Sequence, residues 1–364
     1  LVSVAGTTDG NESGPIDGVF PVTQTTAATS DTVIDYTVTG SATECTDYDS
    51  LSGSVTIPAG DTTAAINIAN IVADSLVEGT ETVTITLDTI TASDPGITID
   101  GASENDTINI VDGDTATVSI AGTADGAETG AVNGAFTVTQ SATAVSDTVI
   151  DYTVTGSATE GTDYDSLSGT VTIPAGDTTA AINIANIVAD SLVEGTETVT
   201  ITLDTITASD PGITIDGASD NDTINIVDGD TATVSIAGTA DGAETGAVNG
   251  VFTVTQSATA VSDTVIDYSV TGSATEGADY DNLSGTVTIP AGLTSATIDI
   301  TNIVADSLVE APETVTITLD AITASDPGIT IDGANDNDTI NIADGDAADV
   351  SIAGTTDGDE AGVD

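Results

Sequence analysis

The sequence predicts an all-β protein made of tandem, seven-stranded, immunoglobulin-like β-sandwiches. Three observations support this fold class: a long internal repeat, strand-like alternation of apolar and polar residues within each repeat, and turn residues between the alternating segments. A repeat of 116 residues is too long for a solenoid unit and suits one independently folding domain. Seven short strands in such a length are typical of an immunoglobulin-like sandwich.

The repeat is visible without gaps. A nine-residue string beginning ValSerValAla or ValSerIleAla recurs every 116 residues, at Val2, Val118, Val234 and Val350. We therefore predict three full repeats, 1–116, 117–232 and 233–348, and the first strand of a truncated fourth repeat within 349–364.

Alternation defines the strands expected in the second repeat. Val and Ile alternate there with Thr and Asn, the pattern of a strand with one buried face. The expected strands are 115–121, 135–140, 148–155, 170–174, 181–187, 197–203 and 223–227. AspGly at 125–126, ProAlaGlyAsp at 174–177 and AspProGly at 210–212 supply turns between them. No segment shows a long helical pattern.

The charge of the chain is unusual. It has 60 Asp plus Glu residues and no Lys, Arg or His, so its net charge is -60. Such a charge opposes compaction, and no ion pair between side chains can offset it. Metal cations or a high salt concentration are the available compensation. Binding to nucleic acid is excluded, because it requires Lys or Arg to displace counterions, and an anionic membrane is a poor partner for the same reason.

Cys45 is the single cysteine, so no disulfide can form within the chain. It stands where the second repeat has Gly161, which favours a neutral loop substitution over an intermolecular cross-link. No apolar run is long enough to span a membrane, and direct membrane insertion is not expected. The chain begins at Leu1 in mid-pattern, and we interpret it as a mature or excised segment of an extracellular or cell-surface protein.

Two segments carry a specific resemblance. Residues 158–176 (AlaThrGluGlyThrAspTyrAspSer through ProAlaGly) and 188–203 (ValAlaAspSerLeuValGluGlyThrGlu and the strand after it) resemble the Calx-beta domain, and the likeness spans nearly every full repeat. The resemblance implies a tandem sandwich that binds Ca²⁺ at one end. The family occurs in sodium–calcium exchangers, integrin subunits and large bacterial surface and adhesion proteins.

The resemblance also implies the metal ligands. They are an early Glu, the Asp of an AspTyr turn, one Asp of a reduced triple-Asp turn, a Glu four residues later, and a closing pair of Asp. In this sequence these positions are Glu12, Asp47, Asp74, Glu78, Asp112 and Asp114; Glu128, Asp163, Asp190, Glu194, Asp228 and Asp230; and Glu244, Asp279, Asp306, Glu310, Asp344 and Asp346. Ala73 and Ser75 occupy positions where the family often has carboxylates, so we expect fewer or more weakly held ions.

The coordination chemistry of Ca²⁺ also favours a metal site at one end of the sandwich. Ca²⁺ takes roughly 6–8 oxygen ligands, and carboxylates on several loops can supply them only if those loops share one end of the sandwich. Converging carboxylates without a cation would repel one another or take up protons. The competing interpretation is that these acids are solvated loop residues, and the AspTyr aspartate can instead cap a turn.

The predicted function is a structural or adhesive extracellular array that forms a Ca²⁺-stabilised rod or surface fibre. Alternatives are a filament joined by strand exchange, a Ca²⁺-sensing module, a spacer of a larger secreted protein, and a halophile's acidic surface that binds no specific metal. Expected partners are calcium, neighbouring repeats or copies of the same chain, and a receptor or matrix bound through regions outside this segment. An enzyme is not expected, because His, Lys and Arg are missing and a glycosidase-like carboxylate pair would lack aromatic platforms.

Overall fold

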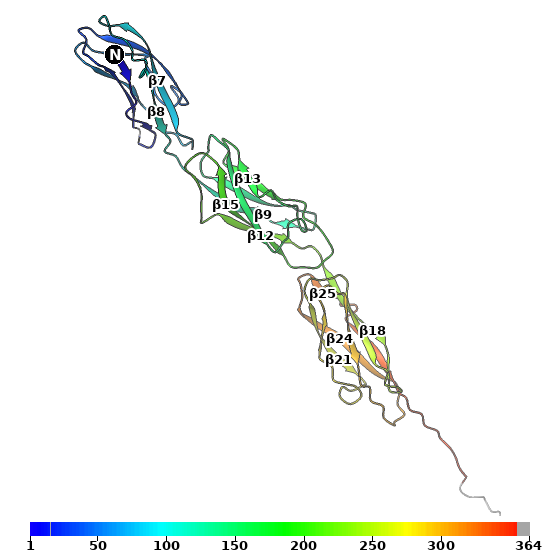
Figure 1. Ribbon diagram of the computed structural model, residues 1–364. Coiled ribbons are helices and arrows are strands. Elements are labelled where there is room, and N and C mark those ends of the chain that lie inside the picture. The colour runs from blue at the N-terminus through cyan, green and yellow to red at the C-terminus, as the bar shows by residue number, and fades with distance from the viewer. Residues whose placement is uncertain (15, 355–364) are drawn as a thin grey trace, which may run out of the picture. The chain divides into compact units, whose positions relative to one another are not determined.

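The computed structural model describes residues 1–14 and 16–354 and confirms the predicted fold class (Figure 1). Every regular element within those residues is a β-strand, and the strands form three repeated β-sandwiches. The limits predicted for the repeats, 1–116, 117–232 and 233–348, stay a prediction. Most of the residues predicted to open a fourth repeat, 355–364, lie outside the described residues.

Each sandwich pairs one five-stranded sheet with one of three or four strands. In the first repeat the strands are β1 (Val2–Val4), β2 (Gly10–Asn11), β3 (Gly18–Gln24), β4 (Thr32–Gly40), β5 (Ser54–Ile57), β6 (Thr63–Ile68), β7 (Glu81–Ala92) and β8 (Asn105–Val111). The sheets have the orders β1-β3-β6 and β2-β8-β7-β4-β5.

The second and third repeats share one pattern. The second has β9 (Ala116–Ala124), β10 (Gly126–Ala127), β11 (Gly134–Gln140), β12 (Thr148–Gly156), β13 (Thr170–Ile173), β14 (Thr179–Ile184), β15 (Glu197–Ala208), β16 (Ile213–Ile215) and β17 (Asn221–Val227). The third has β18 (Ala232–Ala240), β19 (Gly242–Ala243), β20 (Gly250–Gln256), β21 (Thr264–Gly272), β22 (Thr286–Ile289), β23 (Ser295–Ile300), β24 (Glu313–Ala324), β25 (Ile329–Ile331) and β26 (Asn337–Ala343). Their sheet orders are β10-β17-β15-β12-β13 with β14-β11-β9-β16, and β19-β26-β24-β21-β22 with β23-β20-β18-β25.

The alternating pattern explains the core. Along β12 the buried positions include Ile150 and Tyr152, while the residues that alternate with them are more exposed. Phe136 and Val138 of β11 are fully buried from the opposite sheet. Each such apolar side chain contributes about 1.5–3 kcal/mol by leaving water. Apolar burial and the hydrogen bonds of the sheets therefore stabilise the sandwich, and ion pairs between side chains contribute nothing.

The described chain divides into two compact units. The first contains Leu1–Gly126, Asn133–Asn186 and Thr198–Asn225, and the second contains Ala127–Val132, Ile187–Glu197 and the residues from Ile226 onward. The loops of the second repeat that carry Glu128 and Asp190 therefore belong to the same unit as the third repeat.

Residues 349–354, where the strand of a fourth repeat was predicted, form no strand. Val350 and Ile352 are fully exposed. In the third repeat the corresponding strand, β18, pairs with β20 and β25 of its own sandwich. The described part of the chain offers no such partners to residues 349–354, so alternation alone does not produce a strand there.

Cys45 has a backbone conformation that explains why glycine occupies its position elsewhere. Its φ is 66°, and the equivalent Gly161 and Gly277 have φ of 76° and 77°. The tight turn is closed by the Cys45 N–H, which donates to the Tyr48 carbonyl at 2.7 Å. A residue with a Cβ is strained in this left-handed region, whereas glycine is not.

Replacing Cys45 with glycine should stabilise the first repeat by about 1 kcal/mol, the low end of the left-handed penalty for a residue with a Cβ. Differential scanning calorimetry of the full chain would register this as a rise of several degrees in the first-repeat transition. Cys45→Ala is the matched control, because it removes the thiol and keeps the Cβ. Equal stability of the Gly and Ala variants would contradict the explanation.

Candidate metal centre

The candidate site in each repeat forms where a parallel strand pair ends. In the first repeat β2 runs parallel to β8, with Gly10 opposite Ile110 and Asn11 opposite Val111. The next residue on each strand is acidic, Glu12 after β2 and Asp112 after β8. The Glu12 N–H donates to the Val111 carbonyl at 3.1 Å and extends the pairing into the loop. Strand register therefore brings two carboxylates to the same end of the sandwich.

This arrangement produces a compact carboxylate group in all three repeats. Within each group, one ligand-type oxygen from each of three residues lies within 4.8 Å of the other two. The groups are Glu12, Asp112 and Asp114; Glu128, Asp190 and Asp230; and Glu244, Asp344 and Asp346. All nine residues were predicted as ligands. Whether they bind a metal stays a prediction.

Asp112 organises the loops around the first group. One of its carboxylate oxygens accepts from the Glu78 N–H at 2.8 Å, and the other accepts from the Asp114 N–H at 2.7 Å. Asp228 and Asp344 make the same pairs of bonds in the later repeats. The acidic loop between β6 and β7 is thus tied to the end of β8 by a side chain that belongs to the group.

Two other predicted ligands have structural bonds of their own. One oxygen of Asp74 accepts from the Leu76 N–H at 2.7 Å, in a short turn in which the side chain bonds the backbone two residues on. One oxygen of Asp47 accepts from the Thr43 N–H at 2.6 Å. Asp47, the AspTyr aspartate, therefore caps a turn, as considered from the sequence. Asp47 and Asp74 each use one oxygen in these bonds and keep a second carboxylate oxygen that could bind a cation.

Glu12 is the most constrained acid of the first group. Its side chain is 5% exposed, and its Oε2 atom has no hydrogen-bond partner. Burial raises the pKa of Glu12 to about 7, and Asp112 is the largest of the nearby carboxylates that raise it further. Glu128 has the same exposure, an equally unpartnered Oε2 and a pKa of about 7 for the same reasons. An unsatisfied buried carboxylate oxygen is costly unless a proton or a cation satisfies it.

Glu81, the first residue of β7, was not predicted from the sequence and lies beside the same loops. Burial raises its pKa to about 7, the Asp47 and Glu78 charges raise it further, and it shares a hydrogen bond with Asp47. The GluGlyThrGlu spacing at 78–81 was the available signal. Alternation along β7 also places Glu81 on the same face as buried Val83 and Ile85, and its Oε2 is buried without a hydrogen bond.

The third group is more open. Glu244 is half-buried, and Asp346 is exposed. Burial is the largest cause that raises the pKa of Glu244, and a hydrogen bond from the Gly345 backbone lowers it. Each of the three groups therefore consists of one glutamate and two aspartates, but the groups differ in how deeply their side chains are buried.

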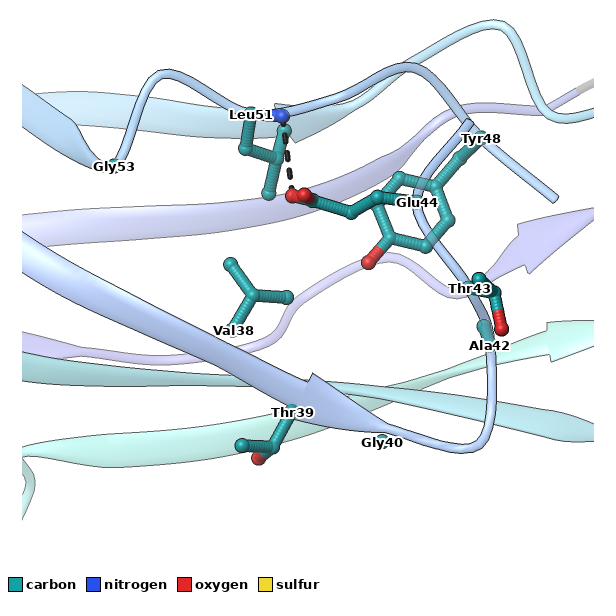
Figure 2. A pocket seen from close by; sticks show the side chains of 9 residues that line it. All are labelled: Val38, Thr39, Gly40, Ala42, Thr43, Glu44, Tyr48, Leu51 and Gly53. Carbon is teal, nitrogen blue, oxygen red and sulfur yellow. Dashed lines mark hydrogen bonds between the residues drawn. The ribbon is translucent and has the colours of Figure 1, made fainter. Parts of the chain in front are cut away.

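A hollow with a volume of about 490 Å³ lies elsewhere in the first repeat (Figure 2). Glu44 and Tyr48 both line it, and a Glu44 carboxylate oxygen accepts from the Leu51 N–H at 3.1 Å. Burial raises the pKa of Tyr48 to about 12, helped by the Glu44 charge. No member of the carboxylate group lines this hollow, so it is not part of the candidate metal centre.

Comparison with known proteins identifies the repeats. The family model of the Calx-beta domain matches residues 11–114, 125–230 and 237–346. The chain belongs to the Calx-beta domain family. This confirms the resemblance read from the sequence, and the domains of this family are not catalytic modules.

Solved structures give weaker likenesses. The crystal structure of CBD12 from CALX1.2 is 17% identical, covers 61% of this chain and 96% of its own, and has a TM-score of 0.27. The apo form of the Calx CBD1 domain is 18% identical, covers 31% of this chain and 99% of its own, with a TM-score of 0.27. With TM-scores this low, these likenesses carry no argument about function. No curated protein matches the chain. Among the described residues, no helix has the length and apolar character needed to cross a membrane.

The raised pKa values predict an unusual pH dependence for metal-free protein. A folded-state pKa of about 7 for Glu12 and Glu128 exceeds the ordinary 4.5, so the folded chain binds more protons than the unfolded chain between these values. Stability should therefore fall as pH rises from about 5 to about 7. Thermal unfolding of exhaustively dialysed protein measures it.

The double variant Glu12→Gln, Glu128→Gln should flatten that decline. Asp177→Asn, in the exposed turn 174–177, is the matched control and should leave the decline unchanged. A melting temperature that is constant or rises across this pH window in the unmodified chain would count against the buried, proton-binding glutamates.

Proposed function

We propose that this chain is a calcium-stabilised structural array of an extracellular or cell-surface protein. Its tandem Calx-beta domains would each hold Ca²⁺ at the end of the sandwich where the carboxylate groups lie. The family's calcium-binding role supports the choice of ion, and the near-identical repeats support a serial structural part rather than a single active site.

One observation carries the proposal. Glu12 and Glu128 are each 95% buried with an unpartnered oxygen, inside a group of three carboxylates, in a chain without a cationic side chain. Protein ion pairing cannot satisfy these oxygens. A hard divalent cation satisfies them and offsets the mutual repulsion of the group. Solvated surface acids would not be buried in this way.

The donor set favours calcium over other metals. Every candidate ligand is a carboxylate, which does not match the nitrogen and sulfur ligands that zinc and copper prefer. The acids come from separate loops, which suits the large and flexible coordination shell of Ca²⁺ better than the strict octahedron of Mg²⁺. Ala73 and Ser75 remove two possible carboxylates, so each repeat should hold few ions.

Metal binding would also stiffen the connection between neighbouring repeats. Asp112 and Asp114 precede β9, the first strand of the second repeat, by a few residues, so the same segment belongs to the group and to the connection between repeats. A cation held there would restrain that connection and stiffen the array. A role in adhesion would then depend on a ligand bound by another part of the protein.

Calcium should raise the melting temperature of the dialysed chain, and a chelator should reverse the rise. A ligand that binds only the folded state adds about 2.7 kcal/mol at 100 times its Kd. Calorimetric titration of the full chain should show saturable binding that weakens at the second repeat in the Asp190→Asn, Glu194→Gln variant. Asp177→Asn is the control and should bind like the unmodified chain.

Sodium chloride at matched ionic strength separates this proposal from simple charge screening. Screening by sodium should give a smaller and non-saturating stabilisation. If concentrated NaCl stabilises the chain as much as calcium does, and calorimetry detects no calcium binding, the proposed function is wrong.

A further inference from the structure

The second repeat has four sheet edges, and three of them are short or closed. β10 has two residues, β16 has three and β13 has four. β10 is also closed by its own turn, in which Ala127 and Val132 exchange backbone hydrogen bonds at 2.9 and 2.8 Å. β14, with six residues, is the longest strand at an edge of this repeat. It is therefore the edge that can accept the most backbone bonds from another strand.

β13, at the edge of the opposite sheet, is capped by a serine side chain. The Ser168 hydroxyl donates to the Thr170 carbonyl at 2.7 Å and accepts from the Thr170 N–H at 3.3 Å. Both backbone groups point away from β12, because the Tyr152 N–H bonds the neighbouring Gly169 carbonyl. The serines 116 residues away in the first and third repeats make the same two bonds. Capping blunts this edge and closes it to a further strand.

β14 has no such cap. The Gln140 N–H donates to the Thr178 carbonyl at 2.8 Å, and the bonded pairs of an antiparallel ladder then recur at every second residue. The residues between them, Thr179, Ala181 and Asn183, therefore turn their backbone N–H and carbonyl groups away from β11. Within the described residues these groups have no hydrogen bond, and the three side chains are exposed. One side of β14 is thus an open row of donors and acceptors.

The first repeat has the same open edge, whereas the third carries a charge there. β6 and β14 share the sequence ThrAlaAlaIleAsnIle, and their ladders follow the same alternation. Thr63, Ala65 and Asn67 are therefore the open residues of β6. β23 has the sequence SerAlaThrIleAspIle, in which exposed Asp299 replaces the asparagine. A charged residue on an edge strand opposes pairing with another strand.

The sheet behind this edge has an outward face without charge. Two rows of exposed or half-buried side chains cross it, Ala181–Thr137–Ala121 and Thr179–Thr139–Ser119. None of these side chains is acidic, in a chain with 60 acids and no cationic side chain. A second copy of the chain is repelled wherever acids of the two molecules face each other. Two copies can therefore approach at this sheet and its edge with little repulsion.

The open row of β14 is complementary to itself. When two copies of β14 lie antiparallel with Ala181 opposite Ala181, Thr179 of each copy lies opposite Asn183 of the other. The open N–H and carbonyl groups then match in three bonded pairs. The side chains that meet are small and uncharged, so no two acids lie opposite each other. A two-fold contact of this kind uses the same surface on both molecules.

We propose that β6 and β14 are docking edges for a second copy of this chain. Such an edge of one copy pairs antiparallel with the same edge of the other, and the two small sheets become one continuous sheet. The proposal does not depend on calcium binding. Acids lie only at the ends of the β14 contact, where Asp177 is opposite Ala185, whose carbonyl accepts from the Asp165 N–H at 3.0 Å. Salt screens this repulsion, so association should strengthen as the salt concentration rises.

Sedimentation equilibrium of the full chain tests the proposal, in excess EDTA so that bridging by calcium is excluded. Self-association should be stronger in about 1 M NaCl, where the screening length is about 3 Å, than in about 0.1 M NaCl. The variant Ala65→Pro, Ala181→Pro removes the central N–H of both open edges and no bond within a sheet. Loss of these bonds should raise the apparent dissociation constant at least about tenfold.

The matched control is Thr56→Pro, Thr172→Pro. These two residues are exposed on the capped edges β5 and β13, and their N–H groups also point away from the sheet. The control should associate like the unmodified chain. A second variant, Asn67→Asp, Asn183→Asp, should weaken association as well, and the fold accommodates it because the third repeat has Asp299 at this position.

The comparison of these variants decides the proposal. Weaker association of the proline and aspartate variants, with unchanged association of the control, supports the docking edges. Association that persists in both variants, or that is lost equally in the control, overturns the proposal, because the contact then lies elsewhere. A chain that stays monomeric in about 1 M NaCl also overturns it and leaves the edges to a strand of another protein. Circular dichroism checks that each variant keeps its sheets, and if the proline variant does not, the aspartate variant decides.

Discussion

Repulsion among carboxylates, in a chain that has no cationic side chain, is the constraint on which the rest of the structure depends. Each repeat must fold by burying Val, Ile, Phe and Tyr between two sheets, because it has no cationic side chain with which its acids could form ion pairs. Most of the 60 acids lie where water solvates them, at little cost. The exceptions are the few that the fold places under protein. Buried Glu12 and Glu128 are where the repulsion is concentrated, and they explain why a cation has a defined place in the molecule.

The parallel pairing of a two-residue strand with the last strand of each repeat is the element that creates this place. β2 against β8, and β19 against β26, set a glutamate directly beside the first aspartate of the closing pair. The aspartate then bonds two backbone N–H groups, one from the loop before β7 or β24 and one from the connection to the next segment. The carboxylate group, the acidic loop and the link between repeats are thus one hydrogen-bonded assembly. Occupancy of the group by a cation would consequently affect folding and inter-repeat contact together.

Much of the fold and many of the clustered acids could be predicted from the sequence, because the patterns that indicate them are local and recur in every repeat. Period-two alternation identifies a strand whenever one face is buried, so all seven main strands of the second repeat were found, although β15 extends to Ala208, well beyond the predicted end at 203. The two-residue β10 and three-residue β16 were not, since so few residues carry no periodic signal. The repeat also predicted a strand within 349–364, and the described residues 349–354 of that segment form none, because a strand needs partners as well as a pattern. For the site, motif order supplied the nine clustered acids. The structure supplied the rest: Glu81 lies in phase with the buried residues of β7 but was not recognised as part of the site, and Asp210 and Asp326 look like ordinary turn residues although each is buried.

The central claim is that a calcium ion satisfies the buried glutamate and its two aspartate neighbours. An anomalous difference map from crystals of the full chain grown with calcium tests it most directly. The account predicts a peak bonded at about 2.3–2.6 Å by oxygens of Glu12, Asp112 and Asp114, and a similar peak beside Glu128. Absence of any peak at either glutamate, with each side chain hydrogen-bonded as a neutral acid, would contradict it.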